Sequence, residues 1–313
     1  MNRILVLGGS GFVGHSVCER LAEAGSRILV PSRRPTNDQD IRMLPGLDLV
    51  RADVHDDATL ARLVSSADAV VNLVGILHGN AAAFEQVHVA LPRRLAAACR
   101  SAARRLVHLS ALGIGADAPS HYLQSKWAGE EALRAAGAEV TLLRPSVVFG
   151  AGDRSMNLFA RLQAVVPIVP LAGSDSRYQP VWVEDLASAV VRALGQPASV
   201  GAIYEAVGPR IYTLAELVRL AGRWSGRERR QIALPAMAAW LEALGMELWP
   251  GEPLLTRDTV ASMRVPSVAS GTLPSLEALG VVPTALEAVA PGYLARDRGC
   301  ARFDRWRAET GVG

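Results

Sequence analysis

Lysine is almost missing from this sequence of 313 residues. Lys126 is the single lysine among 33 Lys and Arg residues. Arginine therefore supplies the positive charge elsewhere. The one lysine provides a compact point charge with three rotatable hydrogen-bond donors, which suggests a specific role at this position. Tyr122 lies four residues earlier, which would place both side chains on one face of a helix. This scarcity makes Tyr122 and Lys126 the first candidates for a chemical role.

Cysteine is scarce too. Cys18, Cys99 and Cys300 have neither the spacing of a metal site nor the even count of a disulfide framework, so we expect buried thiols in a reducing compartment. No uncharged apolar run reaches the roughly 18 residues of a membrane span. The apolar N-terminal run is broken by glycines and has no signal-peptide cleavage site after it. These absences predict a cytoplasmic protein without a resident metal.

The sequence also lacks a strong excess of one charge. The formal net charge is +3 and the arginines are scattered, so we expect no nucleic-acid partner. Half of the residues are hydrophobic and a fifth are charged, which is a globular composition. A chain of this length can bury a large core, in one large domain or two unequal ones.

The chain opens with a predicted strand, a glycine-rich turn and a helix. Residues 4–7 form a short apolar run, typical of a parallel strand buried on both faces. The next seven residues contain the spacing G-x-G-x-x-G, and a helical apolar pattern follows. In this context a pyrophosphate can bind the free N–H groups at the start of the helix. The predicted cofactor contacts of the turn are Gly8, Gly9, Ser10, Gly11, Phe12, Val13 and Gly14.

The second predicted strand, residues 27–30, leads to a basic segment with Ser32, Arg33 and Arg34. NAD-binding proteins usually carry an Asp or Glu here for the ribose 2′-hydroxyl. This sequence has no acid there, and two guanidiniums can bind a 2′-phosphate through charge-assisted hydrogen bonds. NADP(H) is therefore favoured over NAD(H), with a solvated basic loop as the alternative.

Strands and helices continue to alternate, as in a doubly wound parallel sheet with right-handed crossovers. We predict strands at residues 47–50, 69–73, 106–109 and 140–143 and a helix over 84–104. Residues at or just after the ends of two of these strands would meet the nucleotide at the carboxyl edge of the sheet: Asp53, Val54, Leu73, Val74 and Gly75. Asp53 is either an adenine contact or a helix N-cap or turn acid. His88 is interpreted as a structural histidine.

Ser110 follows the predicted strand at 106–109, and Tyr122 and Lys126 follow on the next helix. An adjacent ammonium favours a phenolate, so Lys126 should lower the pKa of Tyr122 from its free value of about 10. The Ser110 hydroxyl can hold a substrate carbonyl or alcohol for proton exchange with Tyr122 and hydride exchange with a nicotinamide. The alternative is an ordinary helix with a packed tyrosine and a solvated lysine.

The glycine turn, Ser110 and Tyr122-x-x-x-Lys126 resemble the short-chain dehydrogenase/reductase superfamily, in its extended or atypical branch. Residues 144–150 are similar to the segment of that branch beside the nicotinamide, which implies contacts from Pro145 and Val148. Residues 84–89, 108–113, 171–183, 212–218 and 246–253 resemble the nucleotide-binding accessory subunit of respiratory complex I and its bacterial relatives. That resemblance implies a tightly held NADPH-type nucleotide and, for the mitochondrial member, a structural role.

The regular alternation of strands and helices ends after residue 150. Beyond it, helices are expected at 153–165, 214–224, 237–248 and 286–294. We predict an NADP(H)-binding Rossmann domain of residues 1–150 plus 178–204 and a smaller, mostly helical domain of residues 151–177 plus 205–313. A substrate cleft between them would be lined from Gly150, Asp153, Asn157 and Gln179. The helix at 237–248, with Trp240 and Trp249, either packs in the core or lies on a membrane or partner.

Two functions are compatible with these features. One is an oxidoreductase or epimerase that uses NADP(H) on an unidentified small carbonyl or alcohol, with Ser110, Tyr122 and Lys126 as catalytic residues. The other is a non-catalytic, nucleotide-holding structural or assembly protein of a respiratory or quinone-handling membrane system, peripheral to the inner face of the membrane. Lys126 binds the nicotinamide ribose in both, whereas Tyr122 is decisive only for the enzyme.

Overall fold

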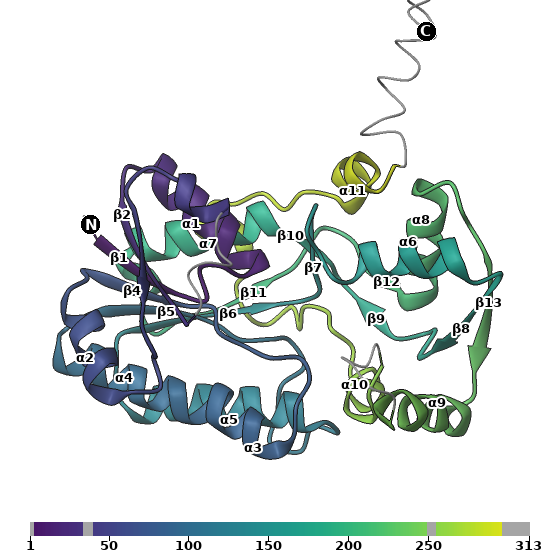
Figure 1. The fold of residues 1–313 in the computed structure, drawn as a ribbon, viewed down its shortest axis with the longest axis horizontal. Helices are drawn as coiled ribbons and strands as arrows, with labels where there is room; N and C mark the ends of the chain where they lie inside the picture. Colours follow the sequence, from purple (N-terminus) through teal and green to yellow (C-terminus); the bar gives the residue numbers. More distant parts are fainter. Residues whose placement is uncertain (1–2, 34–39, 249–254, 296–313) are drawn as a thin grey trace, which may run out of the picture.

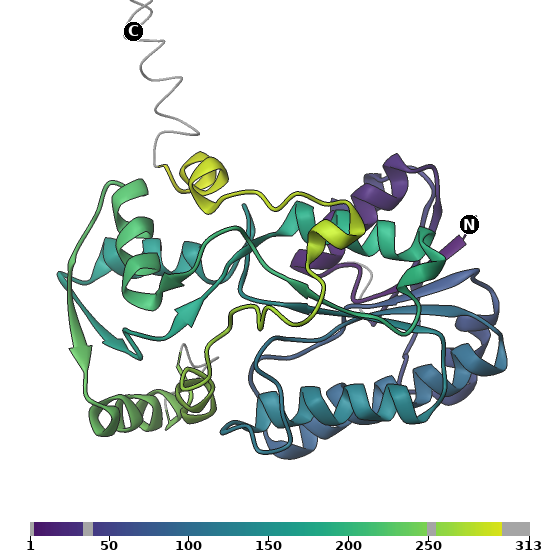
Figure 2. The same cartoon turned by 180° about the vertical axis from the view of Figure 1, so that it is seen from behind.

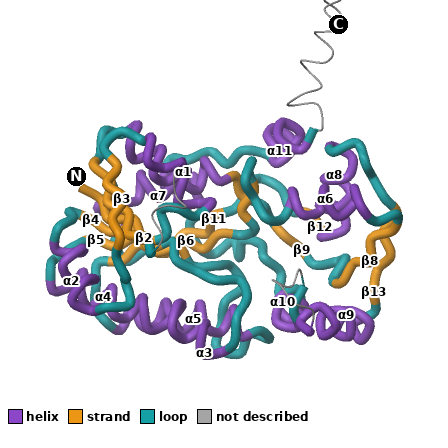
Figure 3. Tube along the Cα trace, in the orientation of Figure 1, coloured by secondary structure: helices purple, strands orange, loops and turns teal. Residues whose placement is uncertain are grey.

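A seven-stranded parallel sheet organises the larger part of the protein. The computed structural model describes residues 3–33, 40–248 and 255–295, so Arg34, Trp249 and Cys300 lie outside the described residues. The sheet order is β11-β6-β5-β4-β1-β2-β3 (Figures 1 and 3). Its strands are β1 (Arg3–Leu7), β2 (Arg27–Ser32), β3 (Leu47–Arg51), β4 (Ala69–Asn72), β5 (Arg105–Leu109), β6 (Val140–Pro145) and β11 (Ile203–Ala206). The predicted doubly wound Rossmann sheet is confirmed.

Helices cover both faces of this sheet. Figure 1 shows α1 (Phe12–Glu23) and α7 (Val183–Gly195) on one face, and α2 (Asp57–Ser65), α4 (Leu91–Ser101) and α5 (His121–Ala135) on the other. Because side chains alternate along a strand, Ile4 and Val6 pack toward the first pair of helices, whereas Leu5 and Leu7 pack toward the second set. Each of these fully buried side chains contributes about 1.5–3 kcal/mol of apolar burial.

The helix predicted over residues 84–104 is helical from Ala81 to Ser101 but contains a wider, π-helical stretch. The chain forms α3 (Ala81–Phe84), a π-helical segment η3 (Glu85–Ala90) and α4. Pro92 has no N–H to donate to the carbonyl of His88, which a regular α-helix would require. That carbonyl instead faces α5, where a Cβ on Gly129 would lie 2.0 Å from its oxygen. The wider turn lets α5, which carries Tyr122 and Lys126, approach closely.

The smaller part of the protein is mixed rather than purely helical. Its helices are α6 (Met156–Val165), α8 (Leu214–Trp224), α9 (Ala236–Leu248), α10 (Arg257–Ser262) and α11 (Leu286–Leu294). The helices predicted at 214–224 and 286–294 are confirmed. The helix predicted from residue 153 begins later, since the Asp153 carboxylate accepts the Asn157 N–H before the first turn. Short strand pairs join these helices: β8 (Ile168–Ala172) with β13 (Arg230–Leu234), β9 (Arg177–Tyr178) with β12 (Tyr212–Thr213), and β7 (Val148–Phe149) with β10 (Val181–Trp182).

One late segment crosses between the two parts of the molecule. After α10 the chain runs to the short helix η5 (Leu276–Leu279) beside the large sheet and then returns to α11, as Figure 2 shows from behind. Leu276, Leu279 and Val281 join the same buried cluster as β1 and α7. These three residues therefore pack with the Rossmann sheet, although the predicted boundary assigned them to the smaller domain. Their isolated apolar pattern gave no sign of which sheet face they would cover.

The sequence also predicts buried cysteine thiols and no membrane-spanning segment. Cys18 and Cys99 are buried and free, and burial raises the pKa of each thiol to about 12, as expected of unreactive core residues. Within the ranges that the structure describes, no helix has both the length and the apolar character needed to cross a membrane.

Candidate functional site

The glycine-rich turn joins β1 to α1 at the point where the strand order of the sheet reverses. Gly8 has a φ of +81°, a left-handed conformation that disfavours other residues, and its carbonyl accepts the Gly11 N–H at 3.0 Å. A Cβ on Gly14 would lie 2.1 Å from the Gly8 oxygen. The turn is therefore drawn tightly over the start of α1, whose free N–H groups can bind a pyrophosphate.

The predicted adenine end lies after β2 and β3. Ser32 ends β2, Arg33 is exposed, and Arg34 falls outside the described residues. The Asp53 carboxylate accepts the His55 N–H at 2.9 Å, so it is a turn acid, and the following helix is capped by Asp56 instead. An adenine contact from Asp53 or Val54 stays a prediction.

Asn72 fixes the segment that follows β4. This fully buried amide accepts the Val74 N–H through Oδ1 and pairs its Nδ2 with His108 Nδ1 at 3.0 Å. Burial, assisted by Lys126, lowers the pKa of His108 well below its usual range and keeps the ring neutral. Asn72 thus has a structural role, and it holds Leu73, Val74 and Gly75 at the carboxyl edge of the sheet.

Lys126 and Ser110 meet at the same edge. Lys126 is 6% exposed, and its Nζ donates to the Leu109 carbonyl at 3.2 Å. A Cβ on Gly75 would lie 3.2 Å from Nζ, so a larger residue there would crowd the ammonium. Burial lowers the pKa of Lys126 from 10.5 to about 8, although Glu130 acts in the opposite direction. The Oγ of Ser110 is buried and has no hydrogen-bond partner among the described residues. A buried ammonium and an unsatisfied hydroxyl therefore lie at the end of one strand.

Tyr122 differs from expectation. Its ring lies in a small aromatic cluster, edge-on to Phe84 at 6.2 Å and to His88 at 5.6 Å between centroids. Burial raises the pKa of Tyr122 to about 12, so the predicted lowering by Lys126 is wrong for this state of the protein. Desolvation of the phenolate causes this shift, and the Lys126 ammonium bonds to the Leu109 carbonyl. At neutral pH the phenol keeps its proton and can donate it to an oxygen that gains negative charge.

His88, in the π-helical segment η3, connects the loop after β4 to α5. Its Nε2 accepts the Ile76 N–H at 3.1 Å, and its Nδ1 bonds to Ser125 Oγ at 2.9 Å. Because Ser125 also donates to the Tyr122 carbonyl, His88 Nδ1 is the donor and the ring is neutral. Burial, with Lys126 nearby, lowers the pKa of His88 to about 3. The interpretation as a structural histidine is confirmed.

A contact that the sequence did not reveal links the smaller part to Tyr122. The Asp258 carboxylate of α10 accepts the N–H groups of His121 at 2.7 Å and Tyr122 at 3.1 Å. Ser262 of the same helix donates to Ser120 Oγ at 2.8 Å. These bonds satisfy donors at the start of α5 that are normally orphaned. The two segments are 136 residues apart, so no local pattern could have predicted the pairing.

The expected lining of the cleft is partly wrong. Asp153 is buried and is held by the hydroxyl of Tyr293, and Gln179 bonds to Gly208 and Ala269. Asn157 is likewise bonded to the carbonyl of Asp153. These side chains tie the loops together, and none of the three lines either of the two cavities described below. Arg177, on β9, is exposed.

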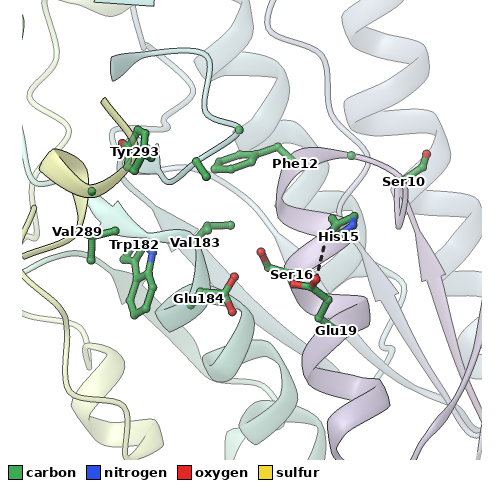
Figure 4. A pocket seen from close by; sticks show the side chains of 14 residues that line it. Ser10, Phe12, His15, Ser16, Glu19, Trp182, Val183, Glu184, Val289 and Tyr293 are labelled. Carbon is green, nitrogen blue, oxygen red and sulfur yellow. Dashed lines mark ion pairs between the residues drawn. The ribbon is translucent and has the colours of Figure 1, made fainter. Parts of the chain in front are cut away.

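Two cavities flank the predicted site. One, of about 660 Å³, opens beside the glycine turn, where Phe12, Trp182 and Tyr293 surround it (Figure 4). The ion pair between His15 and Glu19, at 3.5 Å, lies on its α1 side. The second, of about 590 Å³, lies between α9 and α10 and the loop after β4. The Rossmann edge thus has a cavity on either side.

Comparison with known proteins identifies the family. Residues 4–207 match the NAD dependent epimerase/dehydratase family. The chain belongs to this family. It is an NAD(P)-binding Rossmann protein of the epimerase and reductase type, as the resemblance to extended short-chain dehydrogenases implied.

Relatives of this family member include both a respiratory subunit and a reductase. Subunit 9 of the mitochondrial NADH dehydrogenase [ubiquinone] 1 alpha subcomplex of Mus musculus is 33% identical over 302 residues, which cover 94% of this chain and 80% of that protein. The ceramide reductase of Caulobacter vibrioides is 30% identical over 234 residues, covering 74% and 73%. The fold is similar to that of an NADPH-dependent quinone oxidoreductase of Escherichia coli in complex with NADPH, with a TM-score of 0.75, 21% identity and coverage of 93% and 99%.

Proposed function

We propose that this protein is an NADP(H)-dependent oxidoreductase that reduces a neutral carbonyl compound. The observation that carries the proposal is the pairing of Lys126, a buried ammonium, with Ser110, a buried hydroxyl without a partner among the described residues. Both polar groups carry an energetic penalty in the free protein. A nucleotide ribose and a substrate oxygen would relieve that penalty, which explains why the chain keeps them there.

The chain's own residues fit a nicotinamide nucleotide. The glycine turn leaves room for a pyrophosphate at the start of α1, and Lys126 would bind the hydroxyls of the nicotinamide ribose. When bound, the nicotinamide supplies or accepts a hydride. Ser110 donates a hydrogen bond to the substrate carbonyl oxygen, and Tyr122 donates its proton to that oxygen as the carbonyl carbon is reduced. Lys126 then stabilises the phenolate that remains until a proton from solvent restores it.

The protonated Tyr122 phenol of the nucleotide-free protein suits the proton-donor role that carbonyl reduction requires. A phenol with a pKa of about 12 is protonated at neutral pH and is ready to act as an acid. It would first have to lose that proton before it could serve as a base.

The preference for NADPH rests on the basic end of β2. Arg33 is exposed at the position where an acid would bind the ribose 2′-hydroxyl of NAD, and no acid precedes it in that strand. A guanidinium there can bind the 2′-phosphate. The structurally similar Escherichia coli oxidoreductase was solved with NADPH, which agrees with this choice.

A second function has its own support. The Mus musculus relative is named as a subunit of a respiratory dehydrogenase and matches 94% of this chain. A buried phenol with a raised pKa is also acceptable in a protein that holds a nucleotide without turning it over. In this alternative the protein is a structural or assembly factor, peripheral to the membrane, and Lys126 still anchors the ribose.

Two measurements on the purified protein test the proposal. Mass spectrometry of the released nucleotide is expected to show NADP(H), and NADPH is expected to be consumed when ketones, enones or quinones are added. Release of NAD(H) alone would contradict the cofactor assignment. A bound NADPH that no carbonyl compound oxidises would favour the nucleotide-holding alternative.

A further inference from the structure

The cavity of about 590 Å³ between the smaller part and the Rossmann edge, here called the interdomain cavity, belongs to neither the glycine turn nor the Ser110 edge. Its walls come from the loop after β4, the start of α5, and helices α9 and α10. Figure 1 shows α10 beside the start of α5, with α9 next to α10 on the side away from α5. The cavity is built from side chains far apart in the sequence, and its chemistry limits what it can hold.

The interdomain cavity adjoins Tyr122. Phe84 lines it and is also the ring that meets Tyr122 edge-on at 6.2 Å. His121, the residue before Tyr122, lines it as well, and Asp258 contributes both to the wall and to the N–H bonds that hold Tyr122. A substrate whose carbonyl lies at Ser110 and Tyr122 could extend its remaining part across Phe84 into this space.

The charges of the interdomain cavity disfavour an anion. Of the described lining residues, Arg257 is the one with a permanent positive charge, and the Glu247 carboxylate holds its Nε at 2.9 Å and its backbone N–H at 2.7 Å. Asp258 adds a second carboxylate. One guanidinium against two carboxylates leaves no excess positive charge to bind a phosphate or diphosphate. A nucleoside-diphosphate sugar therefore finds no partner for its diphosphate in this cavity.

The apolar walls favour a hydrocarbon. Leu77 from the loop after β4 is 54% exposed, and Trp240 from α9 is 43% exposed. Both line the interdomain cavity with Phe84 and Pro119. The Arg257 guanidinium stacks on the Trp240 ring at 5.6 Å from its centroid, which holds the indole in place. His78 adds one buried Nδ1 with no partner among the described residues, enough for a single hydrogen bond.

We propose that the interdomain cavity binds the apolar tail of a neutral, lipid-like carbonyl substrate, and that sugar nucleotides are not substrates. The inference rests on the proposed carbonyl reduction and adds the class of molecule. The carbonyl group lies at Ser110 and Tyr122, and an alkyl or aromatic tail runs over Phe84 between Leu77 and Trp240. Binding of the tail removes apolar wall and tail surface from water, so affinity increases with tail length.

The test uses a homologous series of 2-alkanones with saturating NADPH. In the wild type, KM should fall by up to about fourfold for each added methylene, the factor that corresponds to about 0.8 kcal/mol per buried methylene, until the tail fills the cavity. Trp240→Ala and Leu77→Ala should flatten this dependence and raise the KM of the longest ketone by about tenfold, with the KM for NADPH unchanged. Met237→Ala is the matched control, because Met237 is exposed on the same helix as Trp240 but does not line the cavity.

A binding arm separates this inference from the proposed function. The corresponding 2-alkanols cannot be reduced, so calorimetry with NADPH-loaded protein reports tail binding without turnover. Turnover that is independent of chain length, or NADPH-dependent reduction of a UDP-4-keto sugar, would overturn the inference and leave carbonyl reduction standing. If no ketone is reduced, the proposed function fails, and alcohol binding that does not strengthen with chain length would then overturn the cavity assignment too.

Discussion

Replacement of Lys126 by methionine should make the nucleotide-free protein more stable at neutral pH. Burial lowers the pKa of this side chain from 10.5 to about 8, which corresponds to about 3 kcal/mol of unfavourable interaction for its charged form. Methionine fills a similar volume without a charge. It loses the bond to the Leu109 carbonyl, worth about 1 kcal/mol. The net expectation for Lys126→Met is a gain of about 2 kcal/mol in the free energy of unfolding at pH 7.

The lowered pKa of Lys126 also determines how the stability difference between Lys126→Met and the wild type changes with pH. Between pH 8 and 10.5 the unfolded chain keeps the Lys126 proton and the folded chain releases it, so the stability of the wild type rises with pH relative to the variant. The advantage of Lys126→Met should therefore be full below about pH 8 and disappear toward pH 10.5. Urea unfolding at a series of pH values, with and without NADPH, measures both effects. A variant that is less stable than the wild type at pH 7, or a difference that does not change with pH, would refute the reasoning.

Four other changes test separate parts of the site. Ser110→Ala removes a buried unsatisfied hydroxyl, so in urea unfolding the free protein should be as stable as the wild type or up to about 1 kcal/mol more stable. Its NADPH consumption should fall. A large loss of stability would contradict this prediction. Glu130→Gln should lose about 3–5 kcal/mol in the same assay, since this fully buried carboxylate holds Arg144 at 2.6 and 2.9 Å. Arg33→Asp should weaken NADPH binding about tenfold in a titration and spare NADH, and equal losses for both would reject the 2′-phosphate contact. His88→Gln should make acid unfolding less steep between pH 6.5 and 3, because the unfolded chain takes up the histidine proton before the folded chain does.

Much of the Rossmann half was predictable because its signals are local. A short apolar run, a glycine turn and a helical pattern determine where β1 and α1 lie, and parallel strands bring the ends of β4 and β5 to one edge. The proximity of Ser110 and Lys126 follows from that topology. The buried, unpaired state of their polar atoms does not, because burial depends on packing across the whole sheet.

Two of the missed features depend on distant contacts. The Asp258 cap on α5 joins helices from two parts of the molecule, and the raised pKa of Tyr122 arises from an aromatic cluster with Phe84. An estimate from neighbouring charges alone gave the wrong sign, since the sequence shows Lys126 but not the desolvation of the phenol. The π-helical stretch before α4 could have been anticipated from Pro92, because this residue has no N–H to donate to the His88 carbonyl four residues earlier.

The central claim is that Tyr122 transfers a proton during carbonyl reduction, and one pair of variants tests it most directly. Tyr178 is a matched control, because burial also raises the pKa of that phenol to about 12 but the residue lies on β9, which contributes neither Ser110 nor Tyr122. The measurement is the rate at which bound NADPH is oxidised after addition of a long-chain ketone. The account predicts a rate about 100-fold lower for Tyr122→Phe, with unchanged NADPH affinity, and a normal rate for Tyr178→Phe. Equal rates for Tyr122→Phe and the wild type would contradict it.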